Sequence, residues 1–437
     1  MLYLAVNWQE HQECQESQEL LECRSDRKHK ARPYVIAARN VHKAFLYAAA
    51  LVDFDVVWLW PQEMHSLCSC QITPEQLKEE LQKHEIPPAA VYLTSPDYLG
   101  GQQDIRAMAD LCHKYGTILA VDNAHGAYLH FLENSQHPID QGADICCDSA
   151  HKTLPVLTGG AYLQISKQAP EFFTAYAKQA LALFGSTSPS YLTLASLDLC
   201  NAYLADGYKE KLSACVQQIE DVRQKLRQSG WTVEETEALK LTVRAPKGRP
   251  GQALAENLSE KAAGRDLADQ LTKGMTGQVL AEKLRVAGVE CEYADSDYIV
   301  FMITPENSRE DLDRLVQGFG TNPWNSAENL KLVDCIAEES TTTGSKAGSE
   351  DPAQGAGQSS AVTMKPVQCK IACSIREAIF APHESILVKD ALGRICGAPT
   401  VGCPPAIPVV ASGEVIDENA LGLLEYYGIS NIEVVKK

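Results

Sequence analysis

The sequence predicts an α/β fold with a parallel sheet, and three observations support this class. Hydrophobic residues make up 45% of the 437 residues and charged residues 22%, which is an ordinary balance for a globular protein. From Ala31 onward, short apolar runs alternate with helical patterns. A strand, a helix and a second strand follow one another between residues 90 and 121. This order is typical of a βαβ unit with a right-handed crossover.

The composition excludes several classes of function. The 57 Asp and Glu residues exceed the 39 Lys and Arg residues by 18, which argues against binding of nucleic-acid phosphates as the main role. No apolar run reaches the ~18 residues that cross a bilayer, and residues 1–10 lack the basic segment of a signal peptide. The 15 cysteines, with Cys146 next to Cys147, indicate reduced thiols. We therefore expect a cytoplasmic protein without a membrane or nucleic-acid partner.

The first expected elements follow a tail without regular structure. Residues 1–30 are polar and offer little apolar surface, so we expect no fold there. The apolar run Val56 to Leu59 predicts a strand, Pro74 to His84 a helix, and Ala90 to Leu93 a second strand.

The next helix has clear signals at both ends. It is expected from Asp104 to Tyr115, with Asp104 as its N-cap and Gly116 just beyond its C-terminus. Its apolar residues share one face: Ile105, Met108, Ala109 and Cys112. The run Thr117 to Val121 is apolar throughout, as expected for a parallel strand that is covered on both faces.

The later part of the chain predicts a second, smaller α+β unit. Its expected elements are a helix at Val279 to Ala287 and a strand at Tyr298 to Ile303. Two further strands, at Ala143 to Asp148 and Ala161 to Ile165, are expected before this unit, in the large domain. The stretch from Glu338 to Ser360 consists mostly of small polar residues, which predicts a flexible linker. Apolar patterning returns from Ile371 to Lys437 and suffices for a terminal domain.

Polar residues follow two of the expected strands, at Asp122 and at Ser149 to Lys152. Ligands bind at the carboxyl ends of strands in open α/β sheets, so these residues are expected to converge on one crevice. Taken singly, a strand-end Asp is more often a cap, and a Lys after a strand is more often a surface residue. The combination is more informative.

This combination suits pyridoxal 5′-phosphate (PLP). The aldehyde of PLP needs a primary amine, which Lys152 offers, and the pyridine nitrogen needs a carboxylate such as Asp122 to stay protonated. Ala124 is small enough to let the flat ring lie against the backbone, and His125 can donate a hydrogen bond to its phenolic oxygen. The hydroxyl of Ser149 lies close enough in sequence to Lys152 to meet the phosphate.

Two stretches carry a resemblance to a known family. Ala120 to Ala127 and Asp148 to Pro155 closely resemble the Orn/Lys/Arg decarboxylases, a family of fold-type-I PLP-dependent enzymes. Arg39 to Lys43 resembles the family's Arg-Asn-x-His-Lys motif, whose His stacks on the exposed face of the ring; this role falls to His42. Ser186 to Tyr191 resembles the segment with which a neighbouring subunit helps to hold the coenzyme phosphate. This segment contributes Ser186, Thr187 and Ser188 to the expected cofactor-binding residues.

The resemblance implies a fold and a domain organisation. The fold is an aspartate-aminotransferase-like, PLP-dependent major domain with a small α+β domain and a separate C-terminal domain. The expected segments are a tail at 1–30, the PLP-binding large domain at 31–205 without its N-terminal part, the small domain at 206–335, a linker at 336–366 and the C-terminal domain at 367–437.

The resemblance also implies an activity. The family removes CO₂ from lysine, arginine or ornithine and leaves an amine of polyamine metabolism, so we expect a carboxy-lyase that acts as a homodimer or higher homo-oligomer. Asp122 keeps the ring charged, and either Lys152 or His151 returns a proton to the substrate carbon. The residues leave that choice open.

Some positions depart from the family pattern. Asn123 and Tyr128 stand where the family commonly has Glu and His, and no Gly/Ser/Thr-rich turn for the phosphate precedes His42. The missing turn predicts either an N-terminally truncated chain or an impaired homologue that serves as a subunit or binding partner. An aminotransferase on the same fold is a further alternative. No metal site is expected, because Cys68 and Cys70 alone are a weak signal.

Overall fold

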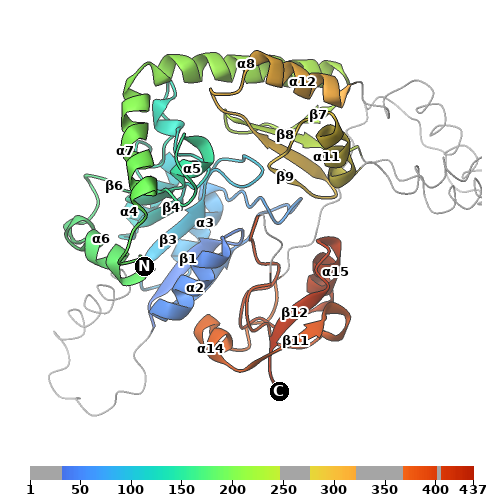
Figure 1. Ribbon diagram of the computed structural model, residues 1–437. Helices are drawn as coiled ribbons and strands as arrows, with labels where there is room; N and C mark the ends of the chain where they lie inside the picture. The colour runs from blue at the N-terminus through green and yellow to red at the C-terminus, as the bar shows by residue number, and fades with distance from the viewer. Residues whose placement is uncertain (1–31, 247–275, 321–367, 401–404) are drawn as a thin grey trace, which may run out of the picture. The chain divides into compact units, whose positions relative to one another are not determined.

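The computed structural model describes residues 32–246, 276–320, 368–400 and 405–437 (Figure 1). The expected tail at 1–30 and the linker at 336–366 lie outside these residues. Contacts divide the chain into two compact units, one formed by residues 1–210 with 363–437 and the other by 211–362. No helix within the described ranges is both long and apolar enough to span a membrane.

The first unit is built on a six-stranded sheet with the order β2-β1-β3-β4-β5-β6. The strands are β1 (Tyr34–Ala38), β2 (Asp55–Leu59), β3 (Ala90–Thr94), β4 (Leu119–Asp122), β5 (Ile145–Asp148) and β6 (Tyr162–Ile165). All neighbouring strands from β2 to β5 are parallel, and β6 pairs antiparallel with β5. The α/β class and the strands expected in this region are confirmed. The strand β1 was not expected.

The helices of this region are α2 (Lys43–Val52), α3 (Pro74–Gln82), α4 (Ile105–Lys114), α5 (Ala150–Thr153), α6 (Glu171–Phe184) and α7 (Tyr191–Ala205), with a short 3₁₀ turn η1 (Leu129–Phe131). The signals that predicted α4 act as expected. The carboxylate of Asp104 accepts a hydrogen bond from the backbone N–H of Ala107, and Gly116 adopts a φ of +68° beyond the helix end.

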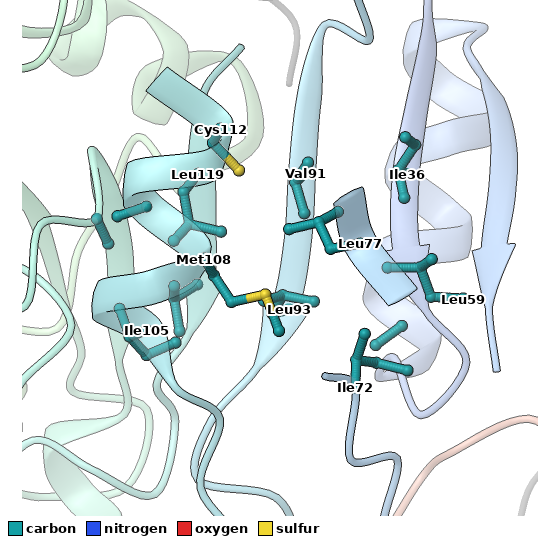
Figure 2. Close-up of a cluster of buried hydrophobic side chains, with 14 of the residues drawn as sticks. Ile36, Leu59, Ile72, Leu77, Val91, Leu93, Ile105, Met108, Cys112 and Leu119 are labelled. Atoms are coloured by element: carbon teal, nitrogen blue, oxygen red, sulfur yellow. The ribbon is translucent and has the colours of Figure 1, made fainter. Parts of the chain in front are cut away.

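Helices cover both faces of the sheet, because successive side chains of a strand point to opposite faces. On one face, α3 and α4 enclose a buried cluster in which Ile36, Leu93 and Met108 are fully buried (Figure 2). On the other face, Val35 and Ala37 of the same strand β1 belong to a second buried cluster that includes residues of α2 and Phe173 of α6. The strands are therefore apolar on both faces, as the sequence predicted.

The second unit is the expected α+β unit. Its sheet has the order β7-β8-β10-β9 and is antiparallel throughout. The elements are α8 (Tyr208–Gln228) from Lys211 onward, β7 (Thr232–Val233), β8 (Lys240–Arg244), α11 (Gly277–Val286), β9 (Tyr293–Ala294), β10 (Tyr298–Met302) and α12 (Arg309–Phe319). The buried residues Leu284, Leu315 and Phe319 form the apolar faces of its two shorter helices.

The C-terminal residues form α14 (Ile375–Phe380), β11 (His383–Leu387), a 3₁₀ turn η3 (Val388–Asp390), α15 (Glu418–Tyr426) and β12 (Asn431–Val435). This segment, expected as a separate domain, belongs to the same compact unit as the six-stranded sheet. The guanidinium of Arg39 donates hydrogen bonds to the carbonyls of Pro408 and Val409, both at 2.9 Å, and lies 3.4 Å from the carboxylate of Glu414. Arg39 and Glu414 are buried, so this contact joins the segment firmly to the sheet.

Candidate active site

Asp122 is the last residue of β4 and marks the carboxyl end of the parallel strands. Its carboxylate accepts hydrogen bonds from the hydroxyl of Tyr92 at 3.2 Å and from the backbone N–H of Ala124 at 3.2 Å. Burial, reinforced by the negative charge of Asp122, raises the pKa of Tyr92 well above its ordinary value. Tyr92 therefore stays protonated, and its hydroxyl donates a hydrogen bond to Asp122 that orients the carboxylate.

Lys152 comes from the short helix α5, which follows directly on β5. The helix ends at Leu154, whose extended backbone is the conformation favoured before a proline, here Pro155. The ammonium nitrogen of Lys152 lies 3.2 Å from Nε2 of His125. His125 is 4% exposed and packs edge-on against the ring of Tyr98. The amine of Lys152, which follows β5, thus contacts His125 in the loop that follows β4.

His42 is the N-cap of α2, and its Nδ1 accepts a hydrogen bond from the backbone N–H of Ala44 at 3.1 Å. Desolvation is the main cause that lowers the pKa of this ring, and the charges of Lys152 and Lys43 act in the same direction. The charge of Asp122 acts against them. The charges of Asp122 and Lys152 both act on the pKa of His42, so these three expected site residues lie in one region.

The titration of His42 offers a test of this convergence. The ring should titrate below its ordinary pKa of 6.5. Replacing Asp122 by Asn removes the negative charge that raises the pKa, so the midpoint should fall further. Histidine ¹H–¹³C spectra recorded against pH measure both values. An unchanged or higher midpoint in the variant would contradict the proximity of the two side chains.

The other expected residues occupy different environments. Nδ1 of His151 lies 2.9 Å from the carbonyl oxygen of Gly160 and donates to it, which ties His151 to the turn before β6. Ser149 is partly buried, and its hydroxyl makes no capping hydrogen bond to α5. Ser186, Thr187 and Ser188 are exposed between α6 and α7, where the hydroxyl of Ser186 accepts a hydrogen bond from the N–H of Ser188.

Sequence reasoning missed two features of this region. Tyr92 was part of an apolar run, and only the pairing of β3 with β4 brings its hydroxyl to Asp122. The second feature is the buried carboxylate of Asp148, which accepts a hydrogen bond from the side-chain amide of Asn123 at 2.6 Å and lies 3.1 Å from Nε2 of His137. A polar residue in the apolar strand β5 was the available signal for Asp148.

Comparisons with known proteins agree with this architecture. Residues 29–247 match the family model described as Orn/Lys/Arg decarboxylase, major domain. The chain is 28% identical to the uncharacterized protein YaaO of Bacillus subtilis and 26% identical to an arginine decarboxylase of the same species. Both alignments cover 89% of this chain and 72% of the relative.

Solved structures show the same fold. The constitutive lysine decarboxylase of E. coli superimposes with a TM-score of 0.61 at 15% identity, over 92% of this chain and 67% of the other. The lysine decarboxylase LdcF of Francisella novicida gives a TM-score of 0.65 at 16% identity, over 93% of this chain and 67% of the other.

Proposed function

The chain belongs to the Orn/Lys/Arg decarboxylase family, and we propose that it is a PLP-dependent decarboxylase that converts arginine, lysine or ornithine to the corresponding amine. The observation that supports this proposal is that the charges of Asp122 and Lys152 both act on His42, while the Lys152 nitrogen lies 3.2 Å from Nε2 of His125. We further propose that it acts in the cytoplasm and in polyamine metabolism.

The donor set of the site fits PLP in its chemistry. Lys152 is a primary amine that can bond to the aldehyde carbon, and it is already placed by the contact with His125. Asp122 is a carboxylate that Tyr92 and a backbone N–H hold in one orientation, as a partner of a protonated ring nitrogen requires. His42 offers a ring whose lowered pKa keeps it neutral near pH 7.

When bound here, PLP supplies a protonated ring that accepts the electrons of the breaking bond between the substrate carbon and its carboxylate. Asp122 holds the proton at the ring nitrogen, because its negative charge favours the protonated form. Tyr92 keeps Asp122 oriented through its hydrogen bond. His42 can cover the open face of the ring without adding a positive charge, and so it helps to exclude water.

A proton must return to the substrate carbon after CO₂ has left. Lys152 and His151 both lie in α5 and are the candidates for this step. Because His151 donates its Nδ1 proton to Gly160, its Nε2 is the atom that can exchange a proton with the substrate. Lys152 can act through its amine.

We propose a homodimer as the working form. The exposed hydroxyls of Ser186 to Ser188 are accessible to a second chain and suit a role in holding the phosphate of a neighbouring site, together with Ser149. Large apolar side chains next to this segment support an interface: Phe184 is 62% exposed, Tyr191 84% and Leu192 74%. Sedimentation of the active protein checks the proposal, and full activity in a monomer would contradict it.

The direct test is to assay the protein, saturated with PLP, for release of CO₂ from arginine, lysine and ornithine. Arginine comes first, because curated relatives from Bacillus subtilis and Bacillus anthracis are named arginine decarboxylases. Formation of a keto acid is measured in the same reaction. Release of CO₂ without keto acid supports the proposal, whereas keto acid alone would favour an aminotransferase and neither product would favour a non-catalytic homologue.

Replacing Asp122 by Asn should lower kcat by about 10²- to 10³-fold, because the neutral amide no longer favours the protonated ring nitrogen. Asn keeps the size of Asp, and its amide can accept from the N–H of Ala124 while it donates to the hydroxyl of Tyr92, so the fold should be unaffected. Rates of CO₂ release give the comparison. The matched control is Asp110→Asn on the exposed side of α4, which should keep the parent rate. Equal rates for both variants would contradict the role of Asp122.

A further inference from the structure

Asp148 is the centre of a buried polar cluster that contains neither Asp122 nor Lys152. Asp148 is 1% exposed, Asn123 is fully buried, His137 is 5% exposed and Cys146 2%. A carboxylate in such surroundings needs donors for both oxygens, because water cannot solvate it. The cluster therefore has to be held together by hydrogen bonds.

Three neighbouring side chains supply these donors. The side-chain amide of Asn123 donates to Oδ1 of Asp148 at 2.6 Å, and the thiol of Cys146 donates to the same oxygen at 3.6 Å. Nε2 of His137 lies 3.1 Å from Oδ2. Nδ1 of His137 accepts the backbone N–H of Ile139 at 3.3 Å, so its proton is on Nε2 and points to Asp148. Asn123, Cys146 and His137 thus each direct a hydrogen toward Asp148. A metal ligand would direct a lone pair instead, so the contacts favour a hydrogen-bonded cluster over a metal site.

The cluster lies on the opposite face of the sheet from Asp122. Cys146 belongs to the buried core beneath α3 and α4, and Asp148 shares its face because it is two residues further along β5. Tyr92, which donates to Asp122, packs with the core on the other face, beneath α2. Asp148 therefore does not act on the reacting groups directly.

The position of Asp148 in the chain nevertheless links those groups. Asn123 directly follows Asp122, and Asp148 ends the strand after which Lys152 is presented. The backbone N–H of Asn123 also donates to the carbonyl of Cys147 at 3.0 Å. Movement of Asp148 relative to Asn123 would therefore shift the strand end of Asp122 relative to the strand end of Lys152.

We propose that Asp148, clamped by Asn123 and His137, is a positioning residue that fixes the spacing between Asp122 and Lys152 from the opposite face of the sheet. The proposal deepens the proposed function and rests on it for its catalytic consequence. The geometric part does not depend on PLP. A misplacement of about 1 Å at a reacting group can cost about 10²-fold in rate, so loss of this clamp should lower kcat more than it changes KM.

The test exchanges the two partners. Asp148→Asn sets two amides against each other, and Asn123→Asp sets two carboxylates against each other at a distance of 2.6 Å in the parent. The double variant with both changes again has one carboxylate and one amide, in swapped positions. If the clamp matters, both single variants lose function and the double variant regains part of it.

The primary readout is the pH titration of His42 in protein without PLP, followed by histidine ¹H–¹³C spectra. The charges that shift the pKa of His42 are Asp122, Lys152 and Lys43, and Asp148 is not among them. A changed midpoint in the single variants therefore reports a changed placement of Asp122 and Lys152, and the swapped double variant should return toward the parent value. In PLP-saturated protein, kcat should fall about 10- to 100-fold in the single variants and recover in part in the double variant.

The matched control is Asp144→Asn. Asp144 is 4% exposed, lies just before the same strand β5 and contacts Nε2 of His113 at 3.0 Å, so it is a second buried Asp–His pair at the other end of the strand. The Asp144→Asn variant can lower the free energy of unfolding as Asp148→Asn does, but it should leave the titration midpoint of His42 and kcat unchanged. A purely structural role of Asp148 would make the two variants alike.

The outcomes separate the two proposals. Unchanged His42 midpoints in folded single variants, or a double variant that is no closer to the parent than either single variant, would overturn the positioning role. If the single variants do not fold, His137→Ala, which removes one donor to Asp148 and leaves Asn123 in place, is titrated together with the double variant, and parent-like midpoints in His137→Ala would count against the clamp. If the midpoints behave as expected but the parent releases no CO₂, the proposed function fails and the positioning role stands.

Discussion

Replacing Lys152 by Ala should remove covalent binding of PLP and lower CO₂ release by roughly 10³-fold or more. The reason is chemical, because a methyl group can neither bond to the aldehyde carbon nor exchange a proton with the substrate. The contact of Lys152 with His125 is lost as well. Absorbance of the bound coenzyme and the initial rate of CO₂ release measure the two effects.

A matched control and a chemical trap make this result decisive. Lys167 is an exposed lysine in the segment after β6, and Lys167→Ala should keep both the absorbance and the rate. Borohydride reduction of the PLP-saturated parent, followed by peptide mapping, should place the label on Lys152. A label on another lysine, or a Lys152→Ala protein with parental activity, would contradict the proposed catalytic role.

Replacing Arg39 by Met should lower the free energy of unfolding of the first unit by about 3–5 kcal/mol, the usual effect of removing one partner of a buried ion pair. Arg39 and Glu414 are both nearly completely buried, and Arg39 also donates hydrogen bonds to the carbonyls of Pro408 and Val409. The guanidinium lies over the rings of Trp58 and Trp60, at 5.1 and 5.4 Å from their centres. Denaturant unfolding followed by tryptophan fluorescence measures the effect.

Two further variants test the cause of this loss. Arg106→Met removes an exposed arginine of α4 and should change stability by less than about 0.5 kcal/mol. Adding Glu414→Gln to Arg39→Met removes the stranded carboxylate, whose pKa burial already raises, and should recover part of the stability. A double variant that is less stable than Arg39→Met would show that the buried charge is not the cause.

The sequence alone determined the fold class and much of the candidate site. Asp104 and Gly116 act locally on the ends of α4, and the apolar run before Asp122 has a composition that only a strand covered on both faces tolerates. Asp122 and Lys152 were predicted as site residues because each lies at or shortly after the end of such a strand, where ligands bind in open α/β sheets. An amine and a carboxylate together then predicted a PLP site, because the aldehyde and the ring nitrogen of PLP need these two groups.

The tertiary structure alone decided which partners these residues have. Tyr92 meets Asp122 because β3 lies beside β4, and Asp148 meets Asn123 because β5 lies on the other side of β4. His137 reaches Asp148 from the loop before β5. Arg39 reaches Glu414 across most of the chain and thereby joins the C-terminal segment to the sheet. Local sequence sets the strand and the face on which a side chain lies. The order of the strands and the desolvation of charges between them depend on the whole fold, so no single stretch of sequence encodes these contacts.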